Sequence, residues 1–206
     1  MWTWSLNWNE VHSDLVVGSC PMTAQDLTRI HDRTGVDGVL CVQSDECLAH
    51  FDIDYSEHLR HGERIGLDMR RVPMRDFDVA DQRRHLANAV RVLGELLSAG
   101  RRVYVHCTAG LGRAPLVVVG RLTLAEMMSE AEAFALVKAR RPGAVPSPEA
   151  LAGCRADLVR LHRARIEAEA GRIYRQRSAA GRPGDAESDW LEAERTVLRS
   201  AVDLPL

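Results

Sequence analysis

Short apolar runs alternate along the chain with longer amphipathic segments. The β-branched runs predict strands at Asp14–Gly18, Gly38–Val42, Asp68–Pro73 and Arg102–Cys107. Apolar residues at helical spacing predict helices at Thr23–Arg33, Asp54–Gly62, Asp81–Ala99, Ala114–Leu124, Ser129–Arg140 and Ser147–Ala170. Strands interleaved with helices predict an α/β fold with a mostly parallel central sheet flanked by helices.

The composition of the chain changes near Ala164. Before it, strands alternate with helices, whereas the rest of the chain is rich in Arg, Glu and Ala and is interrupted by the turn-forming segment SAAGRPGD. The apolar spacing after that segment predicts a further helix over 190–202. We therefore expect one domain over residues 1–163 and a helical C-terminal extension over residues 164–206.

The charge balance and the cysteines limit the function classes. Lys and Arg number 27 and Asp and Glu 29, so the net charge of −2 provides no global field for nucleic acid or an anionic membrane. The five cysteines lack a paired CxxC spacing, which argues against a disulfide framework and a structural zinc site. The sequence shows no signal peptide and no apolar run of about 18 residues, so we expect a soluble, cytoplasmic protein.

The segment Val105–Pro115, VHCTAGLGRAP, carries the strongest chemical signal. A predicted strand delivers Cys107, a glycine-bearing loop follows, and a helix begins at once after Arg113. Such a loop can direct its backbone N–H groups at one anion and favour a thiolate at Cys107. The guanidinium of Arg113 can hold two phosphate oxygens, and His106 is expected to orient the loop and support the negative sulfur. The predicted phosphate-binding residues are Thr108, Ala109, Gly110, Leu111, Gly112 and Arg113.

A second loop supplies carboxylates. In Val72–Asp78, VPMRDFD, a strand runs into a loop that holds Asp76 and Asp78. One helix and one strand separate this loop from Cys107, so both loops return to the same edge of the sheet, where ligands of α/β proteins bind. A thiolate that attacks phosphorus needs an acid to protonate the leaving oxygen, and Asp76 is the candidate, with Asp78 in support. The alternative for either carboxylate is a helix cap or a turn.

These two motifs resemble a known family. HCTAGLGR matches the HCxxGxxR (CX5R) signature of cysteine-dependent dual-specificity phosphatases, and VPMRD matches their short acid loop. With DLVVGSCPMTAQDL and VLCVQSDECLAHFDID, residues 7–158 resemble the catalytic domain of the plant starch-excess glucan phosphatases, functional relatives of laforin. The resemblance implies hydrolysis of phosphate esters on glucan, with Cys107 as nucleophile, Arg113 as clamp, Asp76 as general acid and no metal or organic cofactor. We expect no carbohydrate-binding module in this length.

The resemblance also implies a surface for the sugar chain. Three aromatic residues match positions that bind glucan in that family, where sugar rings stack on aromatic rings: Trp8, Phe51 and Phe77. The alternative for each is packing in the core. Val145 stands where the plant enzymes have Phe. Ala114 stands where most dual-specificity enzymes have Ser or Thr, which predicts slow breakdown of the phosphocysteine.

The other cysteines suggest redox control. Cys41 ends a predicted strand beside the phosphate loop and matches a cysteine of the plant enzymes, so it is a candidate redox partner of Cys107. The alternative is a small buried hydrophobic residue. Cys20 and Cys47 are expected in loops and are weaker candidates, and Cys154 is expected to pack in a helix.

Two other functions stay open from the sequence. The substrate is a phosphorylated glucan or, in the nearest rival reading, a phosphotyrosine or phosphoserine protein, with no nucleic acid or membrane partner. A chain that only binds phosphate is the alternative from a different class. Phosphate release from an aryl phosphate by the wild type and by Cys107→Ser discriminates the enzyme from the binding module.

Overall fold

The computed structural model describes residues 4–203 of the chain. Its sheet has the strand order β1-β2-β5-β3-β4 within these residues, and every pair of neighbours is parallel except β1 and β2. The predicted α/β fold with a mostly parallel sheet is therefore confirmed. The strands are β1 (Trp8–His12), β2 (Leu15–Gly18), β3 (Gly38–Gln43), β4 (Asp68–Met74) and β5 (Val103–His106).

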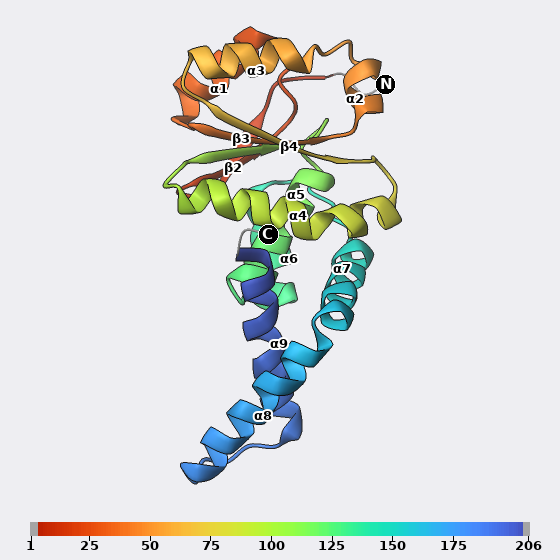
Figure 1. The fold of residues 1–206 in the computed structure, drawn as a ribbon. Coiled ribbons are helices and arrows are strands. Elements are labelled where there is room, and N and C mark those ends of the chain that lie inside the picture. The colour runs from red at the N-terminus through yellow and green to blue at the C-terminus, as the bar shows by residue number, and fades with distance from the viewer. Residues whose placement is uncertain (1–3, 204–206) are drawn as a thin grey trace.

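Helices cover both faces of this sheet. They are α1 (Ala24–Thr34), α2 (Asp45–His50), α3 (Tyr55–Arg64), α4 (Val79–Ser98), α5 (Arg113–Gly120), the π-helical turn η1 (Arg121–Ala125), α6 (Glu130–Arg140), α7 (Pro148–Leu161), α8 (Arg163–Ala179) and α9 (Ala186–Asp203). Figure 1 shows α1, α2 and α3 on one side of the sheet and α4, α5 and α6 on the other, with α8 and α9 extending away from it.

Local interactions define both ends of α1. The Thr23 hydroxyl accepts a hydrogen bond from the Asp26 N–H at 3.3 Å, and the Asp26 carboxylate accepts one from the Thr23 N–H at 3.0 Å. This reciprocal pair satisfies N–H groups that the first helical turn leaves without partners. Gly35 ends the helix at φ 68°, a left-handed conformation that suits glycine.

Two apolar layers hold the sheet in place. Val17, on one face of β2, belongs to the large core under α4 and α5, whereas its neighbour Val16 faces a smaller core that includes Leu27 of α1. Successive side chains of a strand point to opposite faces. Because both faces are covered, the parallel strands read as continuous apolar runs instead of alternating ones.

Some elements differ from the predicted ones. The edge strand β1 and the short helix α2 were not predicted. The single helix predicted over 147–170 is two helices, because the chain turns at His162 between α7 and α8. The helix predicted over 114–124 changes to π-helical geometry at Arg121.

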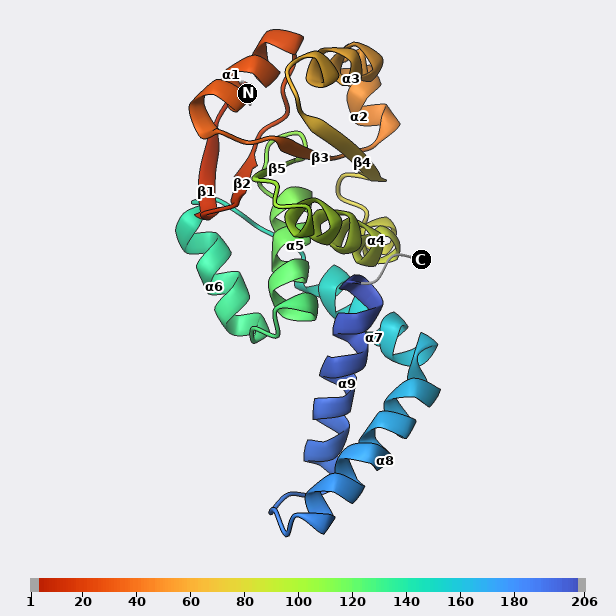
Figure 2. The same ribbon diagram turned by 60° about the vertical axis from the view of Figure 1, so that its left-hand side comes forward.

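The C-terminal segment is a helical hairpin that returns to the sheet domain. Figures 1 and 2 show α8 and α9 side by side, with the end of α9 beside α4. Leu198 and Val202 of α9 are 3% and 1% exposed and belong to the large core. Arg121 also pairs with Asp203 at 2.5 Å. The end of the hairpin therefore completes the core. Within residues 4–203, no helix has the length and apolar character that a membrane span needs.

Candidate active site

The loop between β5 and α5 is held from outside by its carbonyl groups. Four successive carbonyls accept hydrogen bonds from neighbouring segments. The N–H of Cys20 donates to Thr108 O (2.9 Å), the guanidinium of Arg141 donates to Ala109 O and Gly110 O (3.1 Å each), and the N–H of Val145 donates to Leu111 O (2.7 Å). In a trans peptide the C=O and the following N–H point in opposite directions, and the described chain has no cis peptide. The N–H groups of residues 109–112 therefore point away from these supports.

The helix after the loop adds its own donors. Gly112 precedes α5, and no side chain caps this helix. The first N–H groups of an uncapped helix and its positive end favour an anion. Cys107, at the start of the loop, is 3% exposed. Together, the inward N–H groups and the end of α5 form a binding site suited to a phosphate group next to this thiol.

Gly110 is the glycine that the loop requires. Its φ of 70° lies in the left-handed region, and a Cβ built there would lie 2.3 Å from the carbonyl oxygen of Gly18 at the end of β2. Both features exclude a larger residue without a shift of the loop. Gly112 is not constrained in this way, because it has a φ of −109° and a Cβ at this position would meet only open space.

Arg113 joins the phosphate loop to its surroundings. Its side chain has no exposed surface. Nη1 donates to Met74 O at 2.9 Å and to Cys47 Sγ at 3.3 Å, while Nη2 donates to Asp76 Oδ2 at 2.8 Å and to Thr108 Oγ1 at 3.1 Å. Nε has no partner among residues 4–203. The predicted clamp and the predicted acid therefore touch each other.

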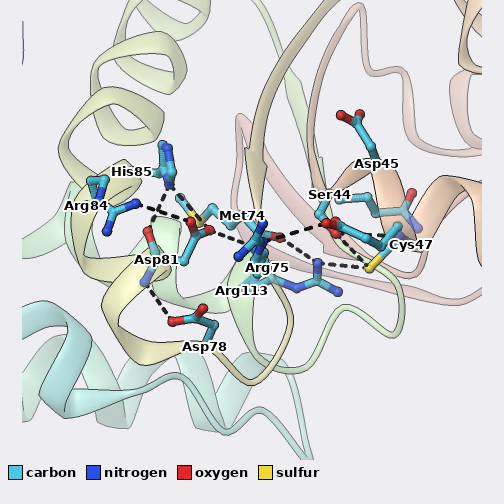
Figure 3. A network of polar contacts seen from close by, with 12 residues as sticks. Ser44, Asp45, Cys47, Met74, Arg75, Asp78, Asp81, Arg84, His85 and Arg113 are labelled. Carbon is cyan, nitrogen blue, oxygen red and sulfur yellow. Dashed lines mark hydrogen bonds and ion pairs between the residues drawn. The ribbon is translucent and has the colours of Figure 1, made fainter.

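The two carboxylates of the acid loop have different surroundings. Asp76 contacts Arg113, and its side chain is 39% exposed. Asp78 precedes α4, and its carboxylate accepts a hydrogen bond from the Asp81 N–H at 2.9 Å, as Figure 3 shows. Asp78 thus has the helix-capping role that the sequence left open. The geometry favours Asp76 over Asp78 as the acid.

His106 is buried beneath the loop. Burial lowers its pKa to about 3, so the ring is neutral near pH 7. Its Nδ1 lies 3.2 Å from the carbonyl oxygen of Cys107. A neutral ring can donate this hydrogen bond and orient the loop, as predicted, but it supplies no positive charge to the sulfur.

A cavity of about 740 Å³ opens beside the loop and the acid loop. It is lined by Ser44, Glu46, Cys47, His50, Phe51, Arg75, Asp76, Phe77, Thr108, Ala109 and Leu111. Phe77 is 96% exposed at φ 57°, and Phe51 is partly buried with its ring edge-on to His50 at 4.7 Å between centroids. Two of the three predicted aromatic residues thus line one cavity.

Comparison with known proteins places this site in a family. The family model described as the catalytic domain of dual specificity phosphatases matches residues 40–153, more than half of the chain. The chain belongs to the dual-specificity phosphatase family. Residues 40–153 include the candidate nucleophile, clamp and acid, and the match identifies the chain as a cysteine-dependent phosphatase.

The relatives of this phosphatase include a protein named as a phosphoglucan phosphatase. Phosphoglucan phosphatase DSP4 of Castanea sativa is 31% identical over 75% of this chain and 41% of its own. Laforin of Mus musculus is 24% identical over 75% of this chain and 50% of its own. The chain thus spans half or less of the length of these relatives. The Castanea protein is named amyloplastic, and the cytoplasmic location stays a prediction.

Solved structures share the phosphatase fold. The active form of Tk-PTP is 26% identical, with a TM-score of 0.59 over 72% of this chain and 94% of its own. PTPMT1 is 20% identical, with the same TM-score over 71% and 90% of the two chains. In both comparisons the shared part accounts for nearly all of the solved chain.

The remaining predicted residues lie elsewhere in the phosphatase. Trp8 does not line the cavity and packs, partly buried, against the smaller apolar core. β1 and β4 are the two outer strands in the sheet order, so Trp8 lies apart from the acid loop, and its role in glucan binding stays a prediction. Val145 is 70% exposed, and its backbone supports the loop. Ala114 is fully buried in the core, and its methyl side chain offers the site no hydroxyl.

The cysteines are placed differently from the predictions. Cys41 is fully buried in β3, and burial raises its pKa to about 11. Its pairing with Cys107 stays a prediction. Cys47 lies in the first turn of α2, not in a loop, and its sulfur contacts Arg113. Cys154 is buried in α7, as expected.

Sequence reasoning missed the supports of the phosphate loop. Arg141 is 4% exposed, and besides the two loop carbonyls it binds the side-chain oxygens of Asn9, at 2.8 Å, and Asn7, at 2.5 Å. Gln43, also buried, donates to Thr108 Oγ1 at 3.2 Å. The partners lie far away in the sequence, and an arginine before Pro142 has the appearance of an ordinary exposed loop residue. No local signal identifies either support.

Proposed function

We propose that this protein hydrolyses phosphate monoesters through a phosphocysteine at Cys107, and that its substrate is phosphorylated glucan. The contact between Arg113 and Asp76 supports the proposal most strongly. It joins the phosphate loop to the acid loop beside one cavity, so one bound phosphate ester reaches the nucleophile, the clamp and the acid together.

The first step breaks the ester. The substrate phosphate accepts hydrogen bonds from the loop N–H groups and from Arg113, which then releases Asp76. The Cys107 sulfur attacks phosphorus and forms the S–P bond while the P–O bond to the sugar breaks. Asp76, in its protonated form, gives its proton to the leaving oxygen.

The second step returns the enzyme. Water attacks the phosphocysteine, the S–P bond breaks, and the carboxylate of Asp76 accepts a proton from that water. Ala114 provides no hydroxyl to stabilise the departing thiolate, so we expect this step to be the slower one.

The shape and composition of the cavity support a sugar substrate. Its volume of about 740 Å³ lies within the range of small-molecule sites. The exposed ring of Phe77 and the ring of Phe51 provide apolar faces on which sugar rings can stack. The similarity to phosphoglucan phosphatases points in the same direction.

The decisive experiment compares two substrate classes. Phosphate release is measured from phosphorylated amylopectin and from phosphotyrosine and phosphoserine peptides at equal phosphate concentration, with Cys107→Ser as the inactive control. The proposal predicts a clearly higher kcat/KM on amylopectin and no release by Cys107→Ser. Higher activity on the peptides would instead favour a protein phosphatase, and release by the variant would exclude the cysteine mechanism.

The aromatic residues provide a second test of the glucan substrate. Phe77→Ala should lower kcat/KM on phosphorylated amylopectin by roughly fivefold to tenfold through loss of stacking, with little change on a small aryl phosphate. The matched control is Tyr174→Ala, which removes an aromatic ring that is 55% exposed on α8, outside the cavity. Equal losses on both substrates would remove Phe77 from glucan recognition.

A further inference from the structure

Cys47 is a cysteine whose surroundings differ from those of the other thiols. Its side chain lines the active-site cavity, whereas Cys20, Cys41 and Cys154 are at most 2% exposed. It lies at the start of α2, where Ser44 caps the helix. A thiol on a cavity wall can meet a small molecule that the buried thiols cannot reach.

Several hydrogen-bond donors converge on the Cys47 sulfur. The Ser44 hydroxyl donates at 3.4 Å, and Nη1 of Arg113 donates at 3.3 Å, as Figure 3 shows. The Thr108 oxygen already accepts N–H groups from Gln43 and Arg113, so its own proton is left to donate, and it is a third donor to this sulfur.

These donors favour the negative form of the sulfur. Partial burial alone would raise the pKa of Cys47, but hydrogen bonds from Ser44, Arg113 and Thr108 lower it below its ordinary value. By contrast, burial raises the pKa of Cys20 to about 12 and that of Cys41 and Cys154 to about 11. The thiolate is the nucleophilic form of cysteine.

The same place is built to receive a ligand. Nε of Arg113 belongs to a side chain with no exposed surface and has no partner among residues 4–203. This donor lies beside Cys47, Asp76 and Thr108, which contact the same guanidinium and line the cavity. A molecule that enters the cavity therefore meets the Cys47 sulfur, which lies directly against the buried guanidinium of Arg113.

We propose that Cys47 is a modification site of this phosphatase, at which small disulfides form a mixed disulfide that blocks phosphate binding. The Cys47 thiol gives its proton to solvent, its sulfur attacks one sulfur of the disulfide, the new S–S bond forms as the old one breaks, and the second half leaves as a thiolate. No other oxidant is consumed. A second thiol reverses the reaction by the same exchange.

The adduct acts on phosphate through Arg113. It fills part of the cavity beside the Arg113 guanidinium, so that a phosphate group can no longer enter there. The modification does not depend on the identity of the phosphorylated substrate, so it is tested without glucan.

The test counts reactive thiols with a nitrobenzoate disulfide that releases a coloured thiolate. In the folded Cys107→Ser chain, one equivalent of the coloured thiolate should be released rapidly, and peptide mass spectrometry should place the adduct on Cys47. The Cys47→Ser/Cys107→Ser chain should show no rapid release, whereas Cys154→Ala in the Cys107→Ser background should keep it. In the denatured wild type all five thiols should react, so a variant in which every remaining thiol reacts rapidly is unfolded.

Inorganic phosphate supplies the second readout. At ten times its dissociation constant, it should slow the rapid phase about tenfold, because only about one site in ten stays open. After modification, the phosphate affinity of the Cys107→Ser chain should fall at least about tenfold. A rapid adduct on another cysteine would overturn the proposal. So would a modification rate of Cys47 that phosphate does not slow, together with a phosphate affinity that the modification does not lower. Cys47→Ser in the Cys107-containing chain repeats the count and should remove one rapid equivalent.

Discussion

Gly110→Ala tests whether the shape of the phosphate loop determines activity. A Cβ at this position would lie 2.3 Å from the carbonyl oxygen of Gly18, whereas an ordinary contact begins near 3.4 Å, so the loop must move by about 1 Å. The opposing atom is backbone at the end of β2 and cannot rotate away. A misplacement of about 1 Å at a reacting centre can cost about 10²-fold in rate. We therefore expect kcat/KM on an aryl phosphate to fall by about 10²-fold.

Gly35→Ala is the matched control for the backbone conformation. Gly35 has a φ of 68°, close to the 70° of Gly110, but a Cβ there has no neighbour within 4 Å. The left-handed conformation alone should cost each variant roughly 1–2 kcal/mol of unfolding free energy, because it is strained for alanine, and the clash at Gly110 adds to this cost. Only Gly110→Ala should lose activity.

The assay combines urea unfolding with the initial rate of aryl phosphate hydrolysis. A Gly110→Ala enzyme that folds and retains at least a third of the wild-type kcat/KM would refute the close packing of the loop against β2. A comparable loss of activity in Gly35→Ala would show that lower stability, and not the position of the loop, causes the defect.

Three further predictions concern the acid, the buried histidine and the hairpin. Asp76→Asn should lower kcat by about 10²-fold in steady-state assays, while Asp78→Asn, which still caps α4, should change it little; the reverse order would contradict the assignment of the acid. Because the pKa of His106 is lowered to about 3, the unfolded chain binds one more proton than the folded chain between about pH 6.5 and 3. The free energy of unfolding should therefore decrease as the pH is lowered through this range, by up to about 1.4 kcal/mol per pH unit, and urea unfolding of His106→Gln should show a smaller slope. Leu198→Ala should lower the free energy of unfolding by about 2–5 kcal/mol in thermal unfolding, and Leu191→Ala, on the same helix but 40% exposed, should lower it much less. Equal losses would show that α9 does not pack in the core.

Local patterns account for most of the fold. The apolar spacing of α1 and the apolar runs of β3 and β5 are each readable within a few residues, and all the elements predicted from them are present. The edge strand β1 was not predicted because only Val11 of its residues is buried, so WNEVH has no apolar run. The turn at His162 was not predicted because it contains neither Gly nor Pro and the helical pattern continues across it.

Contacts between distant segments could not be predicted. The sequence makes Cys107, Arg113 and Asp76 candidates because their motifs are short and specific. Arg141 supports a loop about thirty residues earlier, and the Cys47 sulfur meets Arg113 across 66 positions. Such roles depend on which loops meet at the sheet edge, and one sequence alone does not show this.

Trapping the phosphorylated enzyme tests the central claim most directly. The wild type is quenched during steady-state turnover of a phosphate ester, digested and examined by peptide mass spectrometry. Because Ala114 offers no hydroxyl to help the thiolate leave, the phosphocysteine should accumulate. The account predicts one phosphate on the peptide that contains Cys107 and none on any peptide of Cys107→Ser. Turnover without phosphate on Cys107, or with phosphate on another residue, would contradict it.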